Sequence, residues 1–161
     1  MINGIKQLLD WIYQKKCYFC GKNSSEIICA ICFEKIEINH PQAFRIIQGT
    51  KIYSASFYEK EFQKLIRGLK YHRQKDLAKP FAKILYLFWQ KLECQDENIE
   101  IVPVPLFYKR EKQRGYNQML LVANEFSRLT GYNVNNRIAK RVKDTKPQYK
   151  LSRIERIENM K

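Results

Sequence analysis

The sequence lacks the features that mark a membrane or secreted protein. No apolar run approaches the roughly 20 residues of a membrane-spanning helix, and the longest, residues 84–89, has only about six. The N-terminus lacks the charged start, apolar stretch and small-residue cleavage site of a signal peptide. Internal repeats and low-complexity tracts are also missing. We therefore expect a cytoplasmic protein without a membrane span, whose 161 residues suffice for one medium domain and a small module.

Acidic side chains are scarce relative to basic ones. The chain has 30 Lys and Arg against 16 Asp and Glu, a formal net charge of +14. Most of this excess lies in residues 101–161, where 14 basic and 5 acidic side chains give +9 (14 − 5). The 45% of hydrophobic residues exclude wholesale disorder. The charge favours polyanionic partners, either nucleic acid or phosphorylated small molecules, with a solvated lysine face as the alternative.

Cysteine is not scarce, and four of the five cysteines form the pattern Cys17-x2-Cys20-x8-Cys29-x2-Cys32. A Cys-x2-Cys pair lets two thiolates face one ion, and two pairs complete the tetrahedral sulfur shell that structural zinc prefers. In a reducing cytosol, zinc is favoured over disulfides. We predict a closed, non-catalytic zinc site at these four residues. Two redox dithiols or an iron–sulfur cluster are the alternatives, and Cys94 stands apart.

Hydrophobic periodicity predicts an α/β chain. Helical spacing covers residues 3–16, 59–71, 76–92, 117–129 and 151–160, with Asp76 as an N-cap and Gly131 after a helix C-terminus. Strand character covers residues 51–58 and 98–106 and, weakly, 134–142. A strand–helix–strand order implies a parallel sheet. We expect a zinc module with its leading helix at residues 1–35, a linker at 36–50 and an α/β domain at 51–161.

A basic segment, residues 103–118, follows the predicted buried strand and leads into a helix. It contains a glycine and four cations: Gly115, Lys109, Arg110, Lys112 and Arg114. In open α/β sheets, ligands bind beyond the carboxyl ends of the strands, and helix N-termini attract anions. We read the segment as a loop that forms a phosphate or pyrophosphate site. A solvated basic loop is the alternative.

A second basic segment covers residues 140–156. It mixes cations with Thr145, Gln148 and Tyr149, and Pro147 interrupts it. Such a mixture suits a mobile loop that closes over an anionic ligand. It also suits a strip that contacts a phosphate backbone while an aromatic ring stacks on a base. A surface hairpin is the third interpretation.

Taken in order, these motifs resemble the ComF family. The paired cysteines come first, followed by the aromatic–helix segment 57–71. The central signature is Val102-Pro103-Val104-Pro105 with Arg110-x3-Arg114-Gly115-Tyr116-Asn117-Gln118. The next one is Arg141-x3-Thr145-x-Pro147-Gln148-x2-Leu151-Ser152-x3-Arg156-x2-Asn159. The resemblance implies a Rossmann-like, mainly parallel type I phosphoribosyltransferase domain behind the zinc module.

The resemblance also implies sites and partners. A first loop that handles pyrophosphate would be lined by Arg110, Arg114, Gly115, Asn117 and Gln118. A second loop that closes over phosphoribosyl pyrophosphate would contain or flank Arg141, Thr145, Gln148 and Arg156. The family is linked to natural competence and to handling of transforming single-stranded DNA. Single-stranded DNA is therefore the expected partner, and a competence helicase or a related protein is a second candidate.

The chain departs from the family pattern in one respect. An apolar strand with two adjacent acids and a Thr/Gly-rich turn should hold the ribose and the 5′-phosphate. The adjacent acids here, Asp96-Glu97, are followed by Asn98-Ile99 instead. We therefore expect an incomplete domain, assign no catalytic residue and leave enzymatic activity open. Phosphoribosyl pyrophosphate is expected only in a full-length relative. The alternatives are a non-enzymatic nucleic-acid-binding or helicase-docking module, or an inactive fragment.

Overall fold

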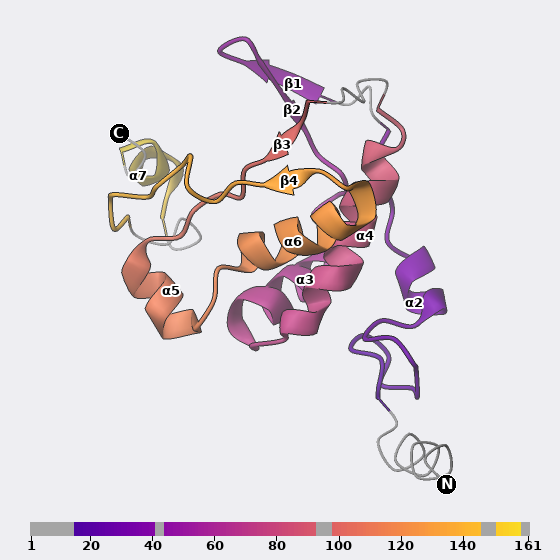
Figure 1. The fold of residues 1–161 in the computed structure, drawn as a ribbon. Helices are drawn as coiled ribbons and strands as arrows, with labels where there is room; N and C mark the ends of the chain where they lie inside the picture. Colours follow the sequence, from indigo (N-terminus) through magenta and orange to yellow (C-terminus); the bar gives the residue numbers. More distant parts are fainter. Residues whose placement is uncertain (1–14, 41–43, 93–97, 146–150, 159–161) are drawn as a thin grey trace, which may run out of the picture.

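A computed structural model describes residues 15–40, 44–92, 98–145 and 151–158 (Figure 1). The described chain mixes helices with two small sheets, which confirms the α/β class. Its elements, in order, are α2 Ala30–Glu34, β1 Phe44–Ile47, β2 Thr50–Tyr53, α3 Lys60–Tyr71, the 3-10 turn η1 Lys75–Leu77, α4 Ala78–Trp89, β3 Glu100–Ile101, α5 Tyr108–Arg114, α6 Gln118–Thr130, β4 Asn133–Val134 and α7 Arg153–Glu158.

The parallel pair β3–β4 confirms the predicted strand–helix–strand order. Glu100 lies opposite Asn133 and Ile101 opposite Val134, and the chain between them forms α5 and α6. In Figure 1, α3 and α6 lie on the same side of this strand pair. The pairing places the basic segment directly after the carboxyl end of β3.

Both strands of this pair are shorter than predicted. Pro103 and Pro105 lack the N–H group that a strand ladder needs, so β3 ends at Ile101. After β4, the Asn135 side chain accepts a hydrogen bond from the Arg137 N–H (3.0 Å), and such local bonds turn the chain away from a sheet. The predicted strands 98–106 and 134–142 were therefore overextended.

The other sheet is an antiparallel hairpin of β1 and β2. The predicted strand 51–58 starts at Thr50 and ends at Tyr53, and its partner β1 lies in the predicted linker. Gln48 and Gly49 between the strands both have positive φ, at 49° and 76°. Two such residues form the tight hairpin turn whose twist matches the strands. The hairpin projects from the helices (Figure 1).

Helices α3, α4 and α6 confirm three of the predicted helices. Gly131 ends α6 in the left-handed conformation (φ 80°) and donates its N–H to the Ser127 carbonyl (2.7 Å). The prediction of Asp76 as an N-cap is wrong, because Asp76 lies inside η1 and Leu77 precedes α4. Proline at Pro80 in the first turn of α4 costs no helical hydrogen bond.

The basic segment after β3 is not the loop that the sequence predicted. Its central part forms α5, which follows the extended residue Phe107 and ends where Gly115 adopts φ 82°. The Gly115 N–H closes the helix on the Glu111 carbonyl (2.7 Å). Lys, Arg, Glu and Gln are good helix formers, and this propensity outweighed the loop interpretation. Four cations therefore project from a helical scaffold.

Three predictions lie outside the described residues. They are the helix at residues 3–16, the isolated Cys94, and Gln148 with its neighbours Pro147 and Tyr149. The predicted helix at residues 151–160 overlaps α7. Among the described helices, none combines the length and apolarity needed to cross a membrane.

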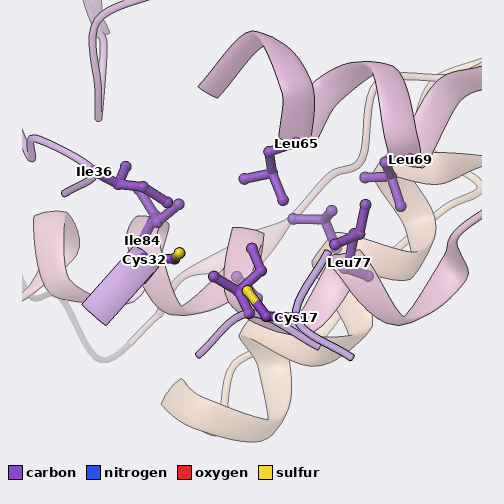
Figure 2. Close-up of a cluster of buried hydrophobic side chains, with 11 residues drawn as sticks. Cys17, Cys32, Ile36, Leu65, Leu69, Leu77 and Ile84 are labelled. Carbon is purple, nitrogen blue, oxygen red and sulfur yellow. The ribbon is translucent and has the colours of Figure 1, made fainter. Parts of the chain in front are cut away.

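The buried core joins the cysteine segment to the helices (Figure 2). Cys17 and Cys32 lie in the same cluster as Leu65 and Leu69 of α3 and Ile84 of α4. The cluster also contains Ile28, Ile36, Leu77, Ala78, Ala82 and Val122. Side chains on α4 pack along α6, where the Trp89 ring meets Phe126 edge-on (6.4 Å between centroids). The cysteine segment is thus part of the main core.

Gly68 lets the Tyr18 ring cross α3. A Cβ atom at position 68 would lie 2.7 Å from the Tyr18 hydroxyl oxygen and 2.9 Å from its Cζ, and it would also collide with Leu77. Glycine inside a helix costs about 1 kcal/mol relative to alanine. Close approach of the cysteine segment explains why this helix carries a glycine.

We predict that Gly68→Ala lowers the free energy of unfolding by about 1 kcal/mol net. Overpacking typically costs about 1–3 kcal/mol, and the better helix propensity of alanine returns part of it. Urea denaturation followed by circular dichroism measures the change. Arg67→Ala, at the exposed neighbouring position, is the control and should change stability by less than about 0.5 kcal/mol. A more stable Gly68→Ala variant would refute the close approach.

Candidate functional site

The four predicted cysteine ligands lie together. Their Sγ atoms all fall within 4.8 Å of one another, and Cys20 Sγ is 3.8 Å from Cys29 Sγ. Cys17 and Cys32 are buried, Cys29 is half-buried and Cys20 is exposed. The grouping has the size and the donors of a tetrahedral thiolate site.

A tight turn aims the first pair of cysteines. The Gly21 N–H donates to the Cys17 carbonyl (2.8 Å), and Gly21 has φ 73°, a conformation that glycine adopts without steric cost. The Cys17 N–H donates to the Lys22 carbonyl (2.8 Å), and this bond joins the two ends of the turn. Both thiols of the pair therefore face the same side of the turn.

The start of α2 aims the second pair. Cys29 is the extended residue before the helix, and the N–H groups of Cys32 and Phe33 donate to its carbonyl at 3.1 and 2.9 Å. The Cys29 N–H donates to Cys17 Sγ (3.3 Å), so the backbone of one pair supports a sulfur of the other. N–H···S contacts of this kind stabilise thiolates.

Ionisation of one of the clustered thiols opposes ionisation of another. Burial opposes ionisation of Cys17, but hydrogen bonds from the backbone of Cys20, Cys29 and Phe19 outweigh it and lower its pKa to about 6. At Cys32, burial, hydrogen bonds with the other cysteines and the charge of Cys17 raise the pKa to about 12. One thiolate suppresses the next, and a bound divalent cation would remove this conflict. The four thiols therefore fit a metal ion that accepts soft sulfur ligands.

Side chains from α3 and from His72, the residue that follows it, hold the cysteine turn in place. The Tyr18 hydroxyl lies 2.8 Å from His72 Nδ1, and Lys64 Nζ donates to the Phe19 carbonyl (2.9 Å). The Lys64 ammonium also lies 5.6 Å from the ring centroids of both aromatic residues. Because Tyr18 and Phe19 lie between the first two cysteines, these contacts position the site.

The two predicted anion-binding segments meet at Thr145. The Arg110 guanidinium on α5 donates to the Thr145 carbonyl, and the Arg141 guanidinium donates to the Thr145 hydroxyl. Arg110 Nε also lies 4.0 Å from Asp144 Oδ1. The structure thus brings together three residues that the family resemblance assigned to separate loops.

The next predicted residues lie at the junction of α5 and α6. Arg114 donates to the Gln118 side-chain carbonyl and lies 5.9 Å from the Tyr71 ring centroid. Asn117 is the N-cap of α6, because its Oδ1 accepts the Met119 N–H at 2.9 Å. Gln118 is buried and Gly115 supplies the left-handed turn. These residues fix the position of Arg114.

Arg156 is the remaining predicted residue within the described part of the chain. Arg156 lies on α7, where its Nε donates to the Leu151 carbonyl (3.1 Å). Tyr71 and Asp144, in contrast, contact the predicted cations although the sequence assigned them no role. Asp144 is the only acid in residues 140–150, and Tyr71 ends the apolar pattern of α3, so both carried a weak signal.

The fold and the cysteine cluster define a mixed α/β protein with four cysteines near its N-terminus that are grouped as in a metal-binding module. No family model matches the sequence, and no solved structure matches the chain. The chain is 35% identical over 100 residues to Competence protein F of Haemophilus influenzae. The match covers 60% of this chain and 44% of that protein, so the chain spans less than half the length of this curated relative. It confirms the resemblance to the ComF family.

We predict that the protein binds one zinc ion per chain and that chelation destabilises the fold. Two of the four ligands, Cys17 and Cys32, lie in the shared core, so loss of the ion leaves two polar or charged sulfurs there. Protons compete with the metal for thiolates, and zinc loss should therefore increase as the pH falls toward about 5. Elemental analysis and thermal unfolding with and without chelator measure both effects.

Cys20→Ser tests the same site without emptying the core, because Cys20 is the exposed ligand. We expect metal content well below one equivalent and a lower melting temperature. A Ser25→Ala variant, in the segment between the two pairs, is the control and should keep its zinc. Full metal content in Cys20→Ser would exclude a four-cysteine site.

Proposed function

We propose that this chain is a ComF-like protein that serves natural competence in the cytoplasm by binding single-stranded DNA, with structural zinc in its cysteine cluster. The meeting of Arg110 and Arg141 at Thr145 is the observation that carries this proposal. It brings the two predicted anion-binding segments, residues 103–118 and 140–156, into contact. Competence is suggested by the name of the H. influenzae relative.

The two guanidiniums retain the capacity to bind phosphate. Each has five N–H donors in a planar fork, and the contacts to Thr145 use only part of them. The ion pair of Arg110 with Asp144 is long, at 4.0 Å, and partly exposed on both sides. Such a pair contributes little free energy in water, so an incoming phosphate can displace it.

Aromatic side chains next to the cations suit single-stranded nucleic acid. The Phe107 and Tyr108 rings lie 4.7 Å apart between centroids at the start of α5, and Tyr108 is 65% exposed. Bases of any sequence can stack on such rings while the phosphates contact the neighbouring arginines. The combination favours a strand with accessible bases over a duplex.

A phosphoribosyltransferase-like architecture is part of the proposal. Residues 103–118 follow the carboxyl end of β3 and precede its parallel neighbour β4, which is where ligands bind in open α/β sheets. The same cations could hold the pyrophosphate of phosphoribosyl pyrophosphate. We assign no catalytic residue, because the sequence offers no acidic pair followed by a Thr/Gly-rich turn for the ribose and 5′-phosphate.

Titration of the zinc-loaded protein with a labelled oligothymidylate at two salt concentrations tests the proposal. Binding should weaken steeply with salt, and Arg110→Gln/Arg141→Gln should reduce the slope of log K against log salt by about 1.4, since each phosphate contact on a single strand contributes about 0.7. Arg45→Gln/Arg128→Gln, on β1 and α6, removes the same charge and should leave the slope nearly unchanged.

A competition arm with phosphoribosyl pyrophosphate separates the two anions. Displacement of the oligonucleotide by the small molecule would indicate a shared site at these arginines. Insensitivity to it would favour a nucleic-acid role alone. Equal slopes for the arginine variant, its control and the unmodified protein would contradict the proposed site.

A further inference from the structure

A second group of cations surrounds Tyr116, outside the Arg110–Arg141 surface. Its members come from the end of α3, the following turn, η1 and the end of α5, and they are Lys70, Arg73, Lys75 and Arg114. None of these elements includes residues of the Arg141–Thr145 segment. We call this group the Tyr116 cluster.

Tyr116 is the fixed centre of the cluster. It is 7% exposed, and its hydroxyl donates to the Leu69 carbonyl at 2.7 Å. Lys75 Nζ lies 5.2 Å from its ring centroid. Burial raises the pKa of Tyr116, while the charges of Arg114 and Arg73 act in the opposite direction. Three of the four cations therefore act on this ring, and Lys70 joins the group through the charge of Arg114.

Within the part of the chain that the structure describes, the cluster gathers positive charge without a carboxylate at ion-pair distance. Among the described residues, none of its four cations forms an ion pair with a carboxylate within 4.0 Å. Burial, with the charge of Arg114 added, lowers the pKa of the half-buried Lys70. Like charges held together in a partly desolvated place cost free energy, and a bound anion would recover it.

Two features hold the cations ready for a ligand. Arg114 is restrained between the Gln118 side chain and the Tyr71 ring. Arg73 has φ 55°, a left-handed conformation that non-glycine residues rarely adopt and that turns the chain between α3 and η1. Such strain persists only where the surrounding structure imposes it.

Helix dipoles explain part of the arrangement but not all of it. Lys70 and Arg114 lie in the last turns of α3 and α5, where the negative end of the helix favours a cation. Arg73 and Lys75 lie beyond the end of α3, yet the charge of Arg73 acts on Tyr116 and Lys75 lies next to its ring. The convergence of all four cations points to an anion.

We propose that the Tyr116 cluster is a second phosphate-binding site and that the phosphate belongs to the backbone of single-stranded DNA, with a base stacked on the 57% exposed Tyr71 ring. The choice of DNA rests on the proposed function, whereas the phosphate chemistry does not. Arg110 and Arg114 lie four residues apart on α5, so they occupy one face of the helix. One strand can thus run along α5 and contact both sites.

The test compares oligothymidylate binding by Lys70→Gln/Lys75→Gln with binding by the unmodified protein. These residues leave the packed Arg114 and Tyr116 in place. We expect the salt slope to fall by about 1.4, corresponding to two lost phosphate contacts. Lys35→Gln/Lys91→Gln, two exposed lysines elsewhere, is the charge-matched control. Circular dichroism and thermal melting verify that each variant is folded.

Tyr71→Leu and Tyr71→Phe test the stacking contact. Leucine removes the aromatic face and should weaken oligothymidylate binding about 10-fold, whereas phenylalanine should preserve it. Equal affinity for both variants would overturn the assignment of a base to Tyr71.

A parallel titration with inorganic pyrophosphate distinguishes the source of the phosphate. If pyrophosphate binds and Lys70→Gln/Lys75→Gln abolishes this binding while the protein ignores DNA, the phosphate site stands and the DNA proposal fails. If DNA binding depends on Arg110 and Arg141 but the lysine variant matches its control, the second site is overturned and the proposed function survives. Absence of binding to both probes would overturn both proposals.

Discussion

The packing of the cysteine segment on α3 is the contact on which the other features of this protein depend. Tyr18 crosses the helix at Gly68 and reaches His72, while Cys17 and Cys32 enter the core. A metal ion in the cluster would therefore stabilise the domain core as well as its own loop, since ligand binding to the folded state is coupled to folding. The same helix ends at Lys70 and Tyr71, so metal binding and the cationic surface share a scaffold.

That surface accumulates positive charge at the expense of stability. The described cations around Tyr116 have no carboxylate partner, and Arg110 has one at 4.0 Å. Repulsion of this kind is tolerated where packing fixes the scaffold, and here the buried Tyr116 and Gln118 do so. A surface with a purely structural role would alternate acidic and basic side chains. Helix α6 does so where Glu125 and Arg128 form an ion pair with 2.5 Å between oxygen and nitrogen.

Sequence patterns predicted the structural elements that depend on residues close together in the sequence. The cysteine spacing predicted the cluster, and apolar periodicity predicted α3, α4 and α6 with the Gly131 terminus. It failed at α5, where helix propensity competed with proline and glycine signals, and at the strand ends. The meeting of Arg110 with Thr145 could not be predicted from periodicity, because it joins residues 35 positions apart, and the family resemblance had placed them in separate loops.

The short helix α5 links these observations. Seven residues are too few for a helix to be stable alone, because nucleation costs more than so few hydrogen bonds return. Contacts at both ends compensate: Arg110 reaches Thr145, and the Gly115 turn delivers Tyr116 to the Leu69 carbonyl. An anion bound to Arg110 or Arg114 would neutralise repulsion on this helix and order it further. Anion binding at these arginines, as proposed, would therefore be coupled to the formation of α5.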